Sequence, residues 1–556
     1  MSGALALPAD RALLRRRWYA EGWYGTTSLA DEMRLGAESH PGARMIFHSD
    51  VRPAEATLAQ LYQGSLRVAA GLAGLGVARG DVVAIQVPNW LEGALCYQAA
   101  MILGAVIVPI VHIYGPAEVG FILRQSGARV FIVPDRWRSI DYLERVSRLG
   151  DTPDLEHLVV IGERWPAGAV GWAELDRFAV DPFVAPVLHP DEVCLLVYTS
   201  GTTAAPKGVC HTHNSLLAEV KTLGATLDTA APTVSLAAFP AGHIAGVLGL
   251  TRLFVRGATT VLMDVWDPAA AAALVDEHGV TSTSGTPFHL TTLLDAAERD
   301  GRTLATLGNY MVGAAGVPPA VVERAAAAGI AAYRAYGSSE HPTITSGRPD
   351  DPLDRRAATD GRLLPGSEII LVDDDGTVVP AGREGEIVSR GPDAFAGYRD
   401  AELDATAFLP GGWFRTGDVG RLDGGGFLTI TDRRKDVIIR GGENISSKEV
   451  EDILAGHPSV AEAAVVAVPD PTYGERVCAF VTLRDNTELD LEAVRRHFAS
   501  TGVARQKTPE RLEVVGELPR TAAGKVKKFE LRDRLRDAGG VGERPEGHPT
   551  GPGVGR

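Results

Sequence analysis

The chain has 556 residues, which is too long for a single hydrophobic core and indicates two or more domains. Hydrophobic residues make up 45% and charged residues 22% of the sequence, as in an ordinary soluble globular protein. The formal net charge of −15 argues against nucleic acid or an anionic membrane as the main partner. Composition therefore favours a protein whose ligands or substrates are small molecules.

No segment has the pattern of a signal peptide or a membrane span. Residues 1–17 contain too short an apolar stretch before their arginines, and no run of about 18 uncharged apolar residues occurs. We therefore expect a cytoplasmic protein without integral membrane association, either a monomer or a homodimer. The cysteines form no Cys-x-x-Cys pair and are expected to be buried thiols: Cys96, Cys194, Cys210 and Cys478.

Strand-like and helix-like runs alternate from about residue 45 to 290. An apolar strand at 82–87 precedes a helix at 92–103 and a further strand at 105–111. This alternation predicts an α/β fold with largely parallel sheets. Near Gly361 the pattern changes to short strands that indicate a small β-rich subdomain: 368–372, 385–389 and 426–431.

The end of the chain reads as a separate α+β unit. Its predicted order is helix 447–455, strand 461–468, strand 477–483, helix 491–499, strand 511–515 and helix 527–536. We expect a large N-terminal domain at 1–434 and a small C-terminal domain at 435–536. Residues 537–556 are rich in Gly and Pro and are expected to be a disordered tail.

The segment Tyr198–Gly208 is the strongest chemical signal in the chain. It is predicted to lie between a buried strand at 193–197 and a helix at 214–223. A turn rich in hydroxyls and backbone N–H groups beside one lysine can hold an anion. It is not a Walker A loop, because Lys207 follows proline and precedes glycine instead of Ser or Thr. Its hydroxyl, glycine and lysine positions are Thr199, Ser200, Gly201, Thr202, Thr203 and Lys207.

Further motifs follow, and each alone has an ordinary structural explanation. His243 lies among small and apolar residues, where a buried core histidine is the usual reading. The remaining segments are turns or surface charge runs when taken singly: 313–316 (Gly-Ala-Ala-Gly), 336–340 (Tyr-Gly-Ser-Ser-Glu), 413–418 (Trp-Phe-Arg-Thr-Gly-Asp), 432–436 (Asp-Arg-Arg-Lys-Asp), 441–446 (Gly-Gly-Glu-Asn-Ile-Ser) and 519–525 (Pro-Arg-Thr-Ala-Ala-Gly-Lys).

Taken in this order, the motifs resemble those of the adenylate-forming superfamily. That superfamily includes acyl-CoA synthetases, adenylation domains of peptide synthetases and beetle luciferase. The resemblance covers about residues 190 to 528. It departs from the family at Ala204, where Ser or Gly is more usual, and at Ser339, where Thr is commoner. It implies an α/β fold with a small mobile C-terminal domain.

The resemblance also implies an ATP site with Mg²⁺. Tyr336 would stack on adenine, Asp418 would accept both ribose hydroxyls, and Glu340, with Thr202, would hold Mg²⁺; an aromatic face, a paired acceptor and hard oxygens suit these tasks. The implied ATP or AMP contacts are Thr199, Ser200, Gly201, Thr202, Thr203, Lys207, Gly313, Ala314, Ala315, Tyr336, Gly337, Ser338, Ser339, Asp418 and Arg433.

Catalysis is implied for Lys525, which would bridge the carboxylate and the α-phosphate, with Glu340 and a positioning His243. Lys435 corresponds to the hinge residue about which the last domain rotates. Coenzyme A would pass Gly441, Gly442 and Glu443. The implied acyl pocket consists of His243, Ile244, Gly246, Val247, Gly313 and Gly337.

The expected reaction is that of an acyl-CoA synthetase: a carboxylic acid and ATP give acyl-AMP and pyrophosphate, and coenzyme A then displaces AMP. Small apolar side chains at 243–250 and 311–317 favour a medium-chain, alicyclic or other bulky hydrophobic acid, steroid side-chain acids included. An enzyme that loads a carrier protein is an alternative, although 237–250 lacks the aspartate that amino-acid activation usually needs. A non-catalytic nucleotide-binding protein is the second alternative. Nothing specific in the sequence supports a luciferase-like oxygenase.

Overall fold

The structure is a computed structural model, and it describes residues 8–199, 206–226, 233–237, 239–314, 317, 319–373, 375–380, 382–433, 437–484, 487–519, 526 and 528–539. The chain divides into two compact units. Unit 1 comprises residues 1–435 with 502–504, and unit 2 comprises residues 436–501 with 505–556. Each unit is described by itself.

A largely parallel sheet forms the first half of unit 1. Its central strands are apolar runs that are buried at every position, such as 82–85 and 106–109, as parallel strands covered on both faces must be. The strands from edge to edge are β21 (Gly397–Tyr398), β11 (Lys207–Thr212), β10 (Val193–Thr199), β4 (Val106–Pro109), β3 (Val82–Ile85), β5 (Ala128–Pro134), β8 (His157–Ile161) and β9 (Val170–Gly171).

A second sheet is parallel from β16 through to β1 and antiparallel at its two edges. Its strands in spatial order are β18 (Arg362–Leu363), β17 (Thr345–Ser346), β16 (Ala331–Tyr336), β15 (Asn309–Val312), β14 (Ser282–Gly285), β12 (Val234–Ala237), β13 (Thr259–Met263), β1 (Arg44–His48) and β2 (Ala54–Thr57). The expected α/β fold with parallel-rich sheets is therefore confirmed.

The β-rich region after residue 361 is an antiparallel sheet, as its short strands predict. The order is β19 (Glu368–Val372), β20 (Gly385–Arg390), β23 (Trp413–Leu422) and β22 (Phe408–Leu409), with β24 (Leu428–Arg433) paired to β23. A separate small hairpin joins β6 (Arg136–Trp137) to β7 (Ile140–Asp141).

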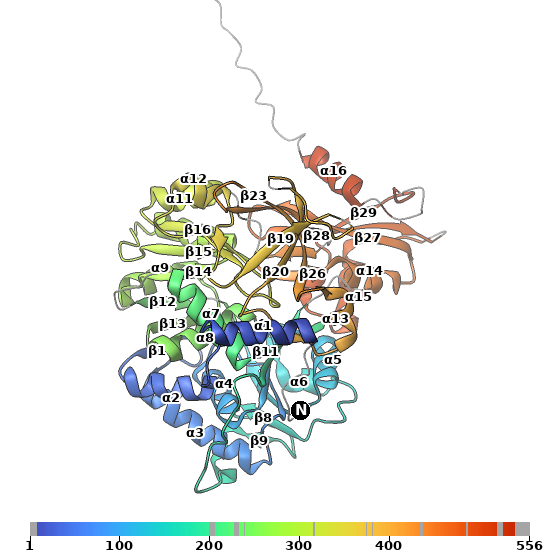
Figure 1. Ribbon diagram of the computed structural model, residues 1–556. Helices are drawn as coiled ribbons and strands as arrows, with labels where there is room; N and C mark the ends of the chain where they lie inside the picture. Colours follow the sequence, from blue (N-terminus) through green and yellow to red (C-terminus); the bar gives the residue numbers. More distant parts are fainter. Residues whose placement is uncertain are drawn as a thin grey trace, which may run out of the picture. The chain divides into compact units, whose positions relative to one another are not determined.

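Helices cover the two large sheets of unit 1, and Figure 1 shows their arrangement. Helices α2, α3, α4, α7 and α8 contact one another, and α9 to α12 contact strands of the second sheet. The helices are α1 (Ala9–Ala20), α2 (Leu29–Ser39), α3 (Leu58–Gly74), α4 (Leu91–Leu103), α5 (Pro116–Ser126), α6 (Tyr142–Val146), α7 (His213–Thr226), α8 (Ile244–Arg256), α9 (Pro268–His278), α10 (Pro287–Arg299), α11 (Pro319–Ala327), α12 (Leu353–Ala358) and α13 (Asp404–Ala407), with 3₁₀ turns at Trp172–Phe178 and Ala401–Leu403.

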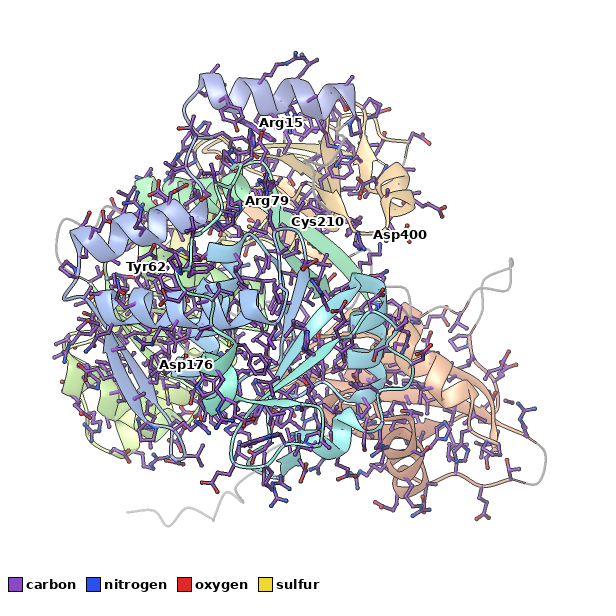
Figure 2. The ribbon with its side chains drawn as sticks, turned by 90° about the horizontal axis from the view of Figure 1, so that it is seen from below. Arg15, Tyr62, Arg79, Asp176, Cys210 and Asp400 are labelled. Atoms are coloured by element: carbon purple, nitrogen blue, oxygen red, sulfur yellow. The ribbon has the colours of Figure 1, made fainter. Side chains whose placement is uncertain are left out.

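The sequence predicted that the glycine- and threonine-rich loop leads directly into a helix, and this prediction is wrong. The loop connects β10 to β11, which pair as an antiparallel hairpin, and α7 begins only at His213. Strand β11 is short and contains Gly208 and polar residues, so it lacks a strong strand pattern of its own; hydrogen bonds to both β10 and β21 form it. Cys210 on this strand lies in the interior of unit 1 (Figure 2).

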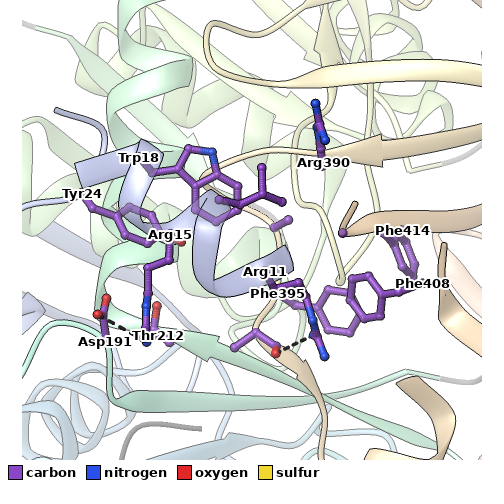
Figure 3. A pocket seen from close by; sticks show the side chains of 14 residues that line it. Arg11, Arg15, Trp18, Tyr24, Asp191, Thr212, Arg390, Phe395, Phe408 and Phe414 are labelled. Atoms are coloured by element: carbon purple, nitrogen blue, oxygen red, sulfur yellow. Dashed lines mark hydrogen bonds and ion pairs between the residues drawn. The ribbon is translucent and has the colours of Figure 1, made fainter. Parts of the chain in front are cut away.

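The N-terminal helix α1 is held against the antiparallel sheet region by the side chains of two charged residues. Asp10 accepts from the backbone N–H groups of Gly411 and Gly412 at 2.9 and 3.0 Å, and Arg11 donates to Asp404 at 2.7 Å. Beneath the helix is a cavity of about 50 Å³ whose lining includes five aromatic and three arginine side chains. Figure 3 shows it with the helix residues Arg11, Arg15 and Trp18 on one wall and Phe395, Phe408 and Phe414 toward one end.

Unit 2 has the predicted α+β order. Its sheet runs β26 (Glu443–Ser446), β25 (Val437–Arg440), β28 (Gly474–Leu483) and β27 (Val460–Asp470), with β29 (Arg511–Val514) parallel to β28. Its helices are α14 (Ser447–Ala455), α15 (Leu491–Thr501) and α16 (Lys528–Gly539), with a 3₁₀ turn at Arg505–Lys507. Helix α16 continues past residue 536, where we expected it to end, and residues 540–556 of the expected tail lie outside the described ranges.

Two further expectations concern burial. The four cysteines are free and buried, as expected. Burial raises the pKa of the Cys210 thiol to about 12, so this group is protonated at neutral pH and is not a nucleophile. Among the described residues, no helix is both long enough and apolar enough to cross a membrane.

Candidate functional site

The hairpin β10–β11 presents Lys207 beside an aromatic ring. Thr199 and Lys207 are opposite each other in the hairpin register, so they close the loop between the two strands. The loop residues Ser200, Gly201, Thr202 and Thr203 lie outside the described part of the chain. The Nζ atom of Lys207 lies 5.2 Å from the centroid of the Tyr398 ring, a cation–π distance.

Tyr398 connects this lysine to the predicted metal-binding carboxylate. Its hydroxyl donates a hydrogen bond to Oε1 of Glu340 at 2.7 Å. Burial, followed by the charge of Glu340, raises the pKa of Tyr398 well above its usual range, so the phenol remains a donor. The sequence motifs did not identify Tyr398, because an aromatic residue in the Phe-Ala-Gly-Tyr stretch 395–398 is also typical of core packing.

The turn after β16 holds Glu340 with little freedom. The N–H of Ser338 donates to the carbonyl of His341 at 2.9 Å, and Oγ of Ser338 accepts from the N–H of Glu340 at 3.2 Å. A Cβ atom on Gly337 would lie 1.9 Å from the carbonyl oxygen of Pro342, so only glycine fits at this close approach of backbone. The predicted segment 336–340 is therefore a compact, internally bonded turn.

Tyr336 and Asp418 are also brought together. The Tyr336 hydroxyl donates to Oδ2 of Asp418 at 2.8 Å, although 82 positions separate the two residues in the chain. The Tyr336 ring is buried beside Ile344 and Leu428, and Asp418 is 9% exposed. The contact fixes the orientation of the carboxylate, while stacking of the Tyr336 ring on a base stays a prediction.

The glycine-rich segment after β15 contains a backbone conformation that is uncommon for alanine. Ala314 has a φ of 61°, in the left-handed region, and costs roughly 1 kcal/mol there. A Cβ on Gly313 would lie 2.6 Å from the carbonyl oxygen of Ala335, on the strand that ends in Tyr336. Strain of this kind is concentrated at functional sites. Ala315 is outside the described residues.

His243 is the N-cap residue of α8, and this helix carries three further residues of the predicted acyl pocket: Ile244, Gly246 and Val247. Val247 is 1% exposed and belongs to the main core. A Cβ on Gly246 would lie 2.1 Å from the carbonyl oxygen of Pro240, so this glycine permits close packing of the preceding loop. Ile244 is half-buried and packs against the same core, and a Cβ on Gly249 would meet nothing within 4 Å.

A buried charge lies behind these elements. Glu219 on α7 is fully buried and accepts from Arg252 at 2.6 Å and from Thr343 at 2.9 Å. Burial raises the pKa of Glu219 to about 7, although Arg252 acts in the opposite direction. Thr343 follows the Glu340 turn, so this pair fixes the base of the turn to α7.

The other predicted residues are placed as follows. Arg433 is opposite Asp418 in the β23–β24 register, which fixes its backbone only. In unit 2, Gly441 and Gly442 have φ values of 58° and 90°, which only glycine adopts readily, and Glu443 begins β26. Lys435 and Lys525 lie outside the described residues. Unit 1 thus brings together Lys207, Tyr336, Glu340 and Asp418.

Comparison with known proteins identifies the class to which this arrangement belongs. The family model described as AMP-binding enzyme matches residues 34–399, and that of the AMP-binding enzyme C-terminal domain matches residues 449–525. The chain belongs to this family, whose members form adenylates, and it is an AMP-forming ligase.

Particular relatives resemble nearly the whole chain. A medium-chain fatty-acid–CoA ligase of Escherichia coli (strain K12) is 36% identical over 93% of this chain and 92% of its own length. A salicylyl-CoA synthase / salicylate adenylyltransferase of a Streptomyces species is 34% identical over 94% of this chain and 96% of its own. The solved amide bond synthetase McbA from Marinactinospora thermotolerans matches with a TM-score of 0.81 at 27% identity, covering 91% of this chain and 99% of that one.

Proposed function

We propose that the chain is an ATP- and Mg²⁺-dependent acyl-CoA synthetase for a medium-chain, alicyclic or other bulky hydrophobic acid. The observation that carries the proposal is the convergence in unit 1 of Lys207, Glu340 and Asp418, which lie far apart in the sequence. An anionic carboxylate must approach a polyanionic triphosphate in the first half-reaction, so positioned cations and donors dominate the barrier. The roles below follow from that requirement.

Nucleotide binding is assigned to Asp418, Tyr336 and the loop closed by Thr199 and Lys207. Asp418 accepts the ribose hydroxyls, and Tyr336 holds its carboxylate in place from the opposite side at 2.8 Å. Lys207 faces the phosphates from the start of β11, and the Tyr398 ring beside it limits where its ammonium group can lie. The second half-reaction, the attack of the coenzyme A thiol, is assigned to the Gly441 loop after rotation about Lys435.

The residues present fit a magnesium ion that arrives with the nucleotide. Mg²⁺ is usually held by one or two carboxylates together with substrate phosphates and water. Glu340 supplies one carboxylate on a turn that is fixed by internal bonds, and Thr202 is the second proposed ligand. No cluster of three or more His, Cys, Asp or Glu side chains suited to a metal is found among the described residues. When bound, the ion neutralises charge on the departing pyrophosphate.

The class of acid is argued from α8. Between residues 244 and 250 this helix carries no charged side chain, and a Cβ on Gly249 would meet nothing within 4 Å. An apolar, small-residue wall suits a hydrophobic tail. The name of the Escherichia coli relative supports a medium-chain acid, whereas the name of the Streptomyces relative makes an aromatic hydroxy acid the principal competitor.

The test is pyrophosphate release from the purified chain with ATP, Mg²⁺ and single acids, with and without coenzyme A. We expect octanoate and cyclohexane carboxylate to give acyl-CoA and AMP, and acetate to give little product. Adenylate formation without transfer to coenzyme A would point instead to a carrier-protein acceptor. A stronger response to salicylate than to every aliphatic acid would overturn the proposed substrate class, and no response to any acid would overturn the activity.

Replacing Asp418 by asparagine is expected to raise the KM for ATP by about 10-fold or more, since a hydrogen bond to a charged group contributes roughly 1.5–3 kcal/mol. Asparagine retains the size but loses the charge. Pyrophosphate exchange as a function of ATP concentration measures the effect. Tyr336→Phe, which removes the hydroxyl that makes the 2.8 Å contact, is expected to give a smaller increase. An unchanged KM in Asp418→Asn would show that the ribose binds elsewhere.

A further inference from the structure

The turn that carries Glu340 is held by groups from outside as well as by its own bonds. The Tyr398 hydroxyl contacts the Glu340 carboxylate, and the N–H of Phe395 donates to the Glu340 carbonyl at 2.7 Å. The third contact is an imidazole: Nε2 of His211 lies 2.7 Å from the carbonyl oxygen of Ser339. Ser339 immediately precedes Glu340, so His211 fixes the peptide that sets the position of the carboxylate.

The protonation state of His211 follows from its surroundings. The residue is fully buried, and burial lowers its pKa from 6.5 to about 4, so the ring is neutral at physiological pH. A neutral imidazole carries one N–H, and the carbonyl oxygen of Ser339 can only accept. The proton therefore resides on Nε2. The other nitrogen, Nδ1, accepts from Oγ of Ser215 at 3.1 Å, which anchors the ring to the first turn of α7.

His211 also lies on the strand that begins with Lys207. Strand β11 pairs with β21, so Lys207, His211 and Tyr398 all belong to one pair of strands. A further contact ties the same region, since the N–H of Ala396 donates to the carbonyl of Cys210 at 2.8 Å. His211 and Ser339 are 128 positions apart in the chain. No single sequence motif contains both residues.

We propose that His211 is a positioning residue for adenylate formation, which fixes Glu340 relative to Lys207 by holding the Ser339 carbonyl. The inference rests on the proposed function, because it assumes that Glu340 and Lys207 act on the triphosphate. It assigns His211 no contact with a substrate. Attack of the thiol on a preformed acyl-adenylate involves no triphosphate, so that half-reaction does not require this geometry.

Two amide variants separate the Ser339 contact from the mere presence of a polar side chain. In His211→Gln the amide nitrogen reaches the position of Nε2 and can donate to Ser339. In His211→Asn the shorter side chain reaches only as far as Nδ1, toward Ser215, and the Ser339 carbonyl is left without its donor. Both variants bury one amide, and they differ in whether that amide can reach the Ser339 carbonyl.

The measurement is pyrophosphate exchange against Mg·ATP concentration, together with conversion of synthetic acyl-adenylate and coenzyme A to acyl-CoA. We expect His211→Asn to lose about 10-fold in kcat/KM for Mg·ATP, as for an unsatisfied buried carbonyl, and to need more Mg²⁺. Acyl-adenylate conversion should stay within about twofold of wild type, since it bypasses the contact. His211→Gln should recover most of the exchange activity.

His213 provides the matched control. It lies two positions further on, is 1% exposed, and burial likewise lowers its pKa to about 4, but its Nδ1 accepts from the N–H of Leu29, away from the turn. His213→Asn is expected to lose stability without separating the two half-reactions. Should His211→Asn fail to fold, Ser215→Ala, which removes the anchor on Nδ1, is expected to give a weaker form of the same separation.

Equal losses in both half-reactions, or equal behaviour of the asparagine and glutamine variants, would overturn the positioning role and leave His211 a structural residue. Wild-type protein that shows no exchange with any acid would instead overturn the proposed function. The two failures are distinguishable, because the first requires an active wild type.

Discussion

Replacing Lys525 by alanine is expected to lower pyrophosphate exchange by about 10²–10³-fold while leaving the conversion of preformed acyl-adenylate within a few-fold of wild type. Lys525 is the last residue matched by the C-terminal family model, at the end of the Pro519–Lys525 motif. A compact ammonium group between the attacking carboxylate and the α-phosphate lowers the repulsion between two anions. That repulsion exists only in the first half-reaction, so the two halves should separate.

The control for this variant is Lys528→Ala. Lys528 lies three positions further along, and its Nζ forms an ion pair with Glu451 at 2.7 Å and a hydrogen bond to Ser447 at 2.9 Å, all within unit 2. Its loss should lower the stability of unit 2 without separating the half-reactions. If Lys525→Ala retained exchange activity, or if Lys528→Ala showed the same separation, the catalytic lysine would have been assigned wrongly.

Unit 1 is expected to lose stability steeply between pH 6.5 and pH 4. Burial lowers the pKa of three histidines from 6.5 to about 4: His211, His213 and His289. In each of them Nδ1 accepts a hydrogen bond in the folded state, which protonation would break. Because the unfolded chain binds these protons more readily, the stabilisation is complete above pH 6.5 and is lost as the pH falls toward 4.

Each histidine can account for about 3 kcal/mol across this window. A typical domain has a total stability of roughly 5–15 kcal/mol, so the expected loss is large. Glu219 acts in the opposite sense. Its pKa is raised to about 7, so its contribution grows as the pH falls from 7 toward 4.5, but it is one group against three.

Urea unfolding of the chain at pH 7.5, 6 and 4.5 measures this dependence. In His289→Gln, which removes one titrating group, the loss of stability between pH 7.5 and 4.5 should be smaller than in wild type by up to about 3 kcal/mol. Glu219→Gln should make the loss steeper. An identical pH dependence in wild type and His289→Gln would show that this histidine does not titrate between the folded and unfolded states.

The sequence by itself determined the class of fold and the family. Local patterns are sufficient for elements whose side chains repeat with the period of a strand or a helix, and the ranges 368–372 and 447–455 were predicted to the residue. The ordered motifs from Tyr198 to Lys525 likewise predicted the adenylate-forming family, because a motif is a local string. The reach of α16 to Gly539 was missed, since helix ends are weakly encoded in sequence.

The tertiary structure decided how the motifs meet. Strand β11 is formed by hydrogen bonds to β10 and β21 and not by its own pattern, so the loop before it appeared to enter a helix. Tyr398 and His211 contact the Glu340 turn across 58 and 128 positions of the chain. Such contacts depend on strand order and register, which are set when distant segments pair. A periodic pattern read along one segment contains no information about its partner, and therefore the chemistry could be named from sequence but its geometry could not.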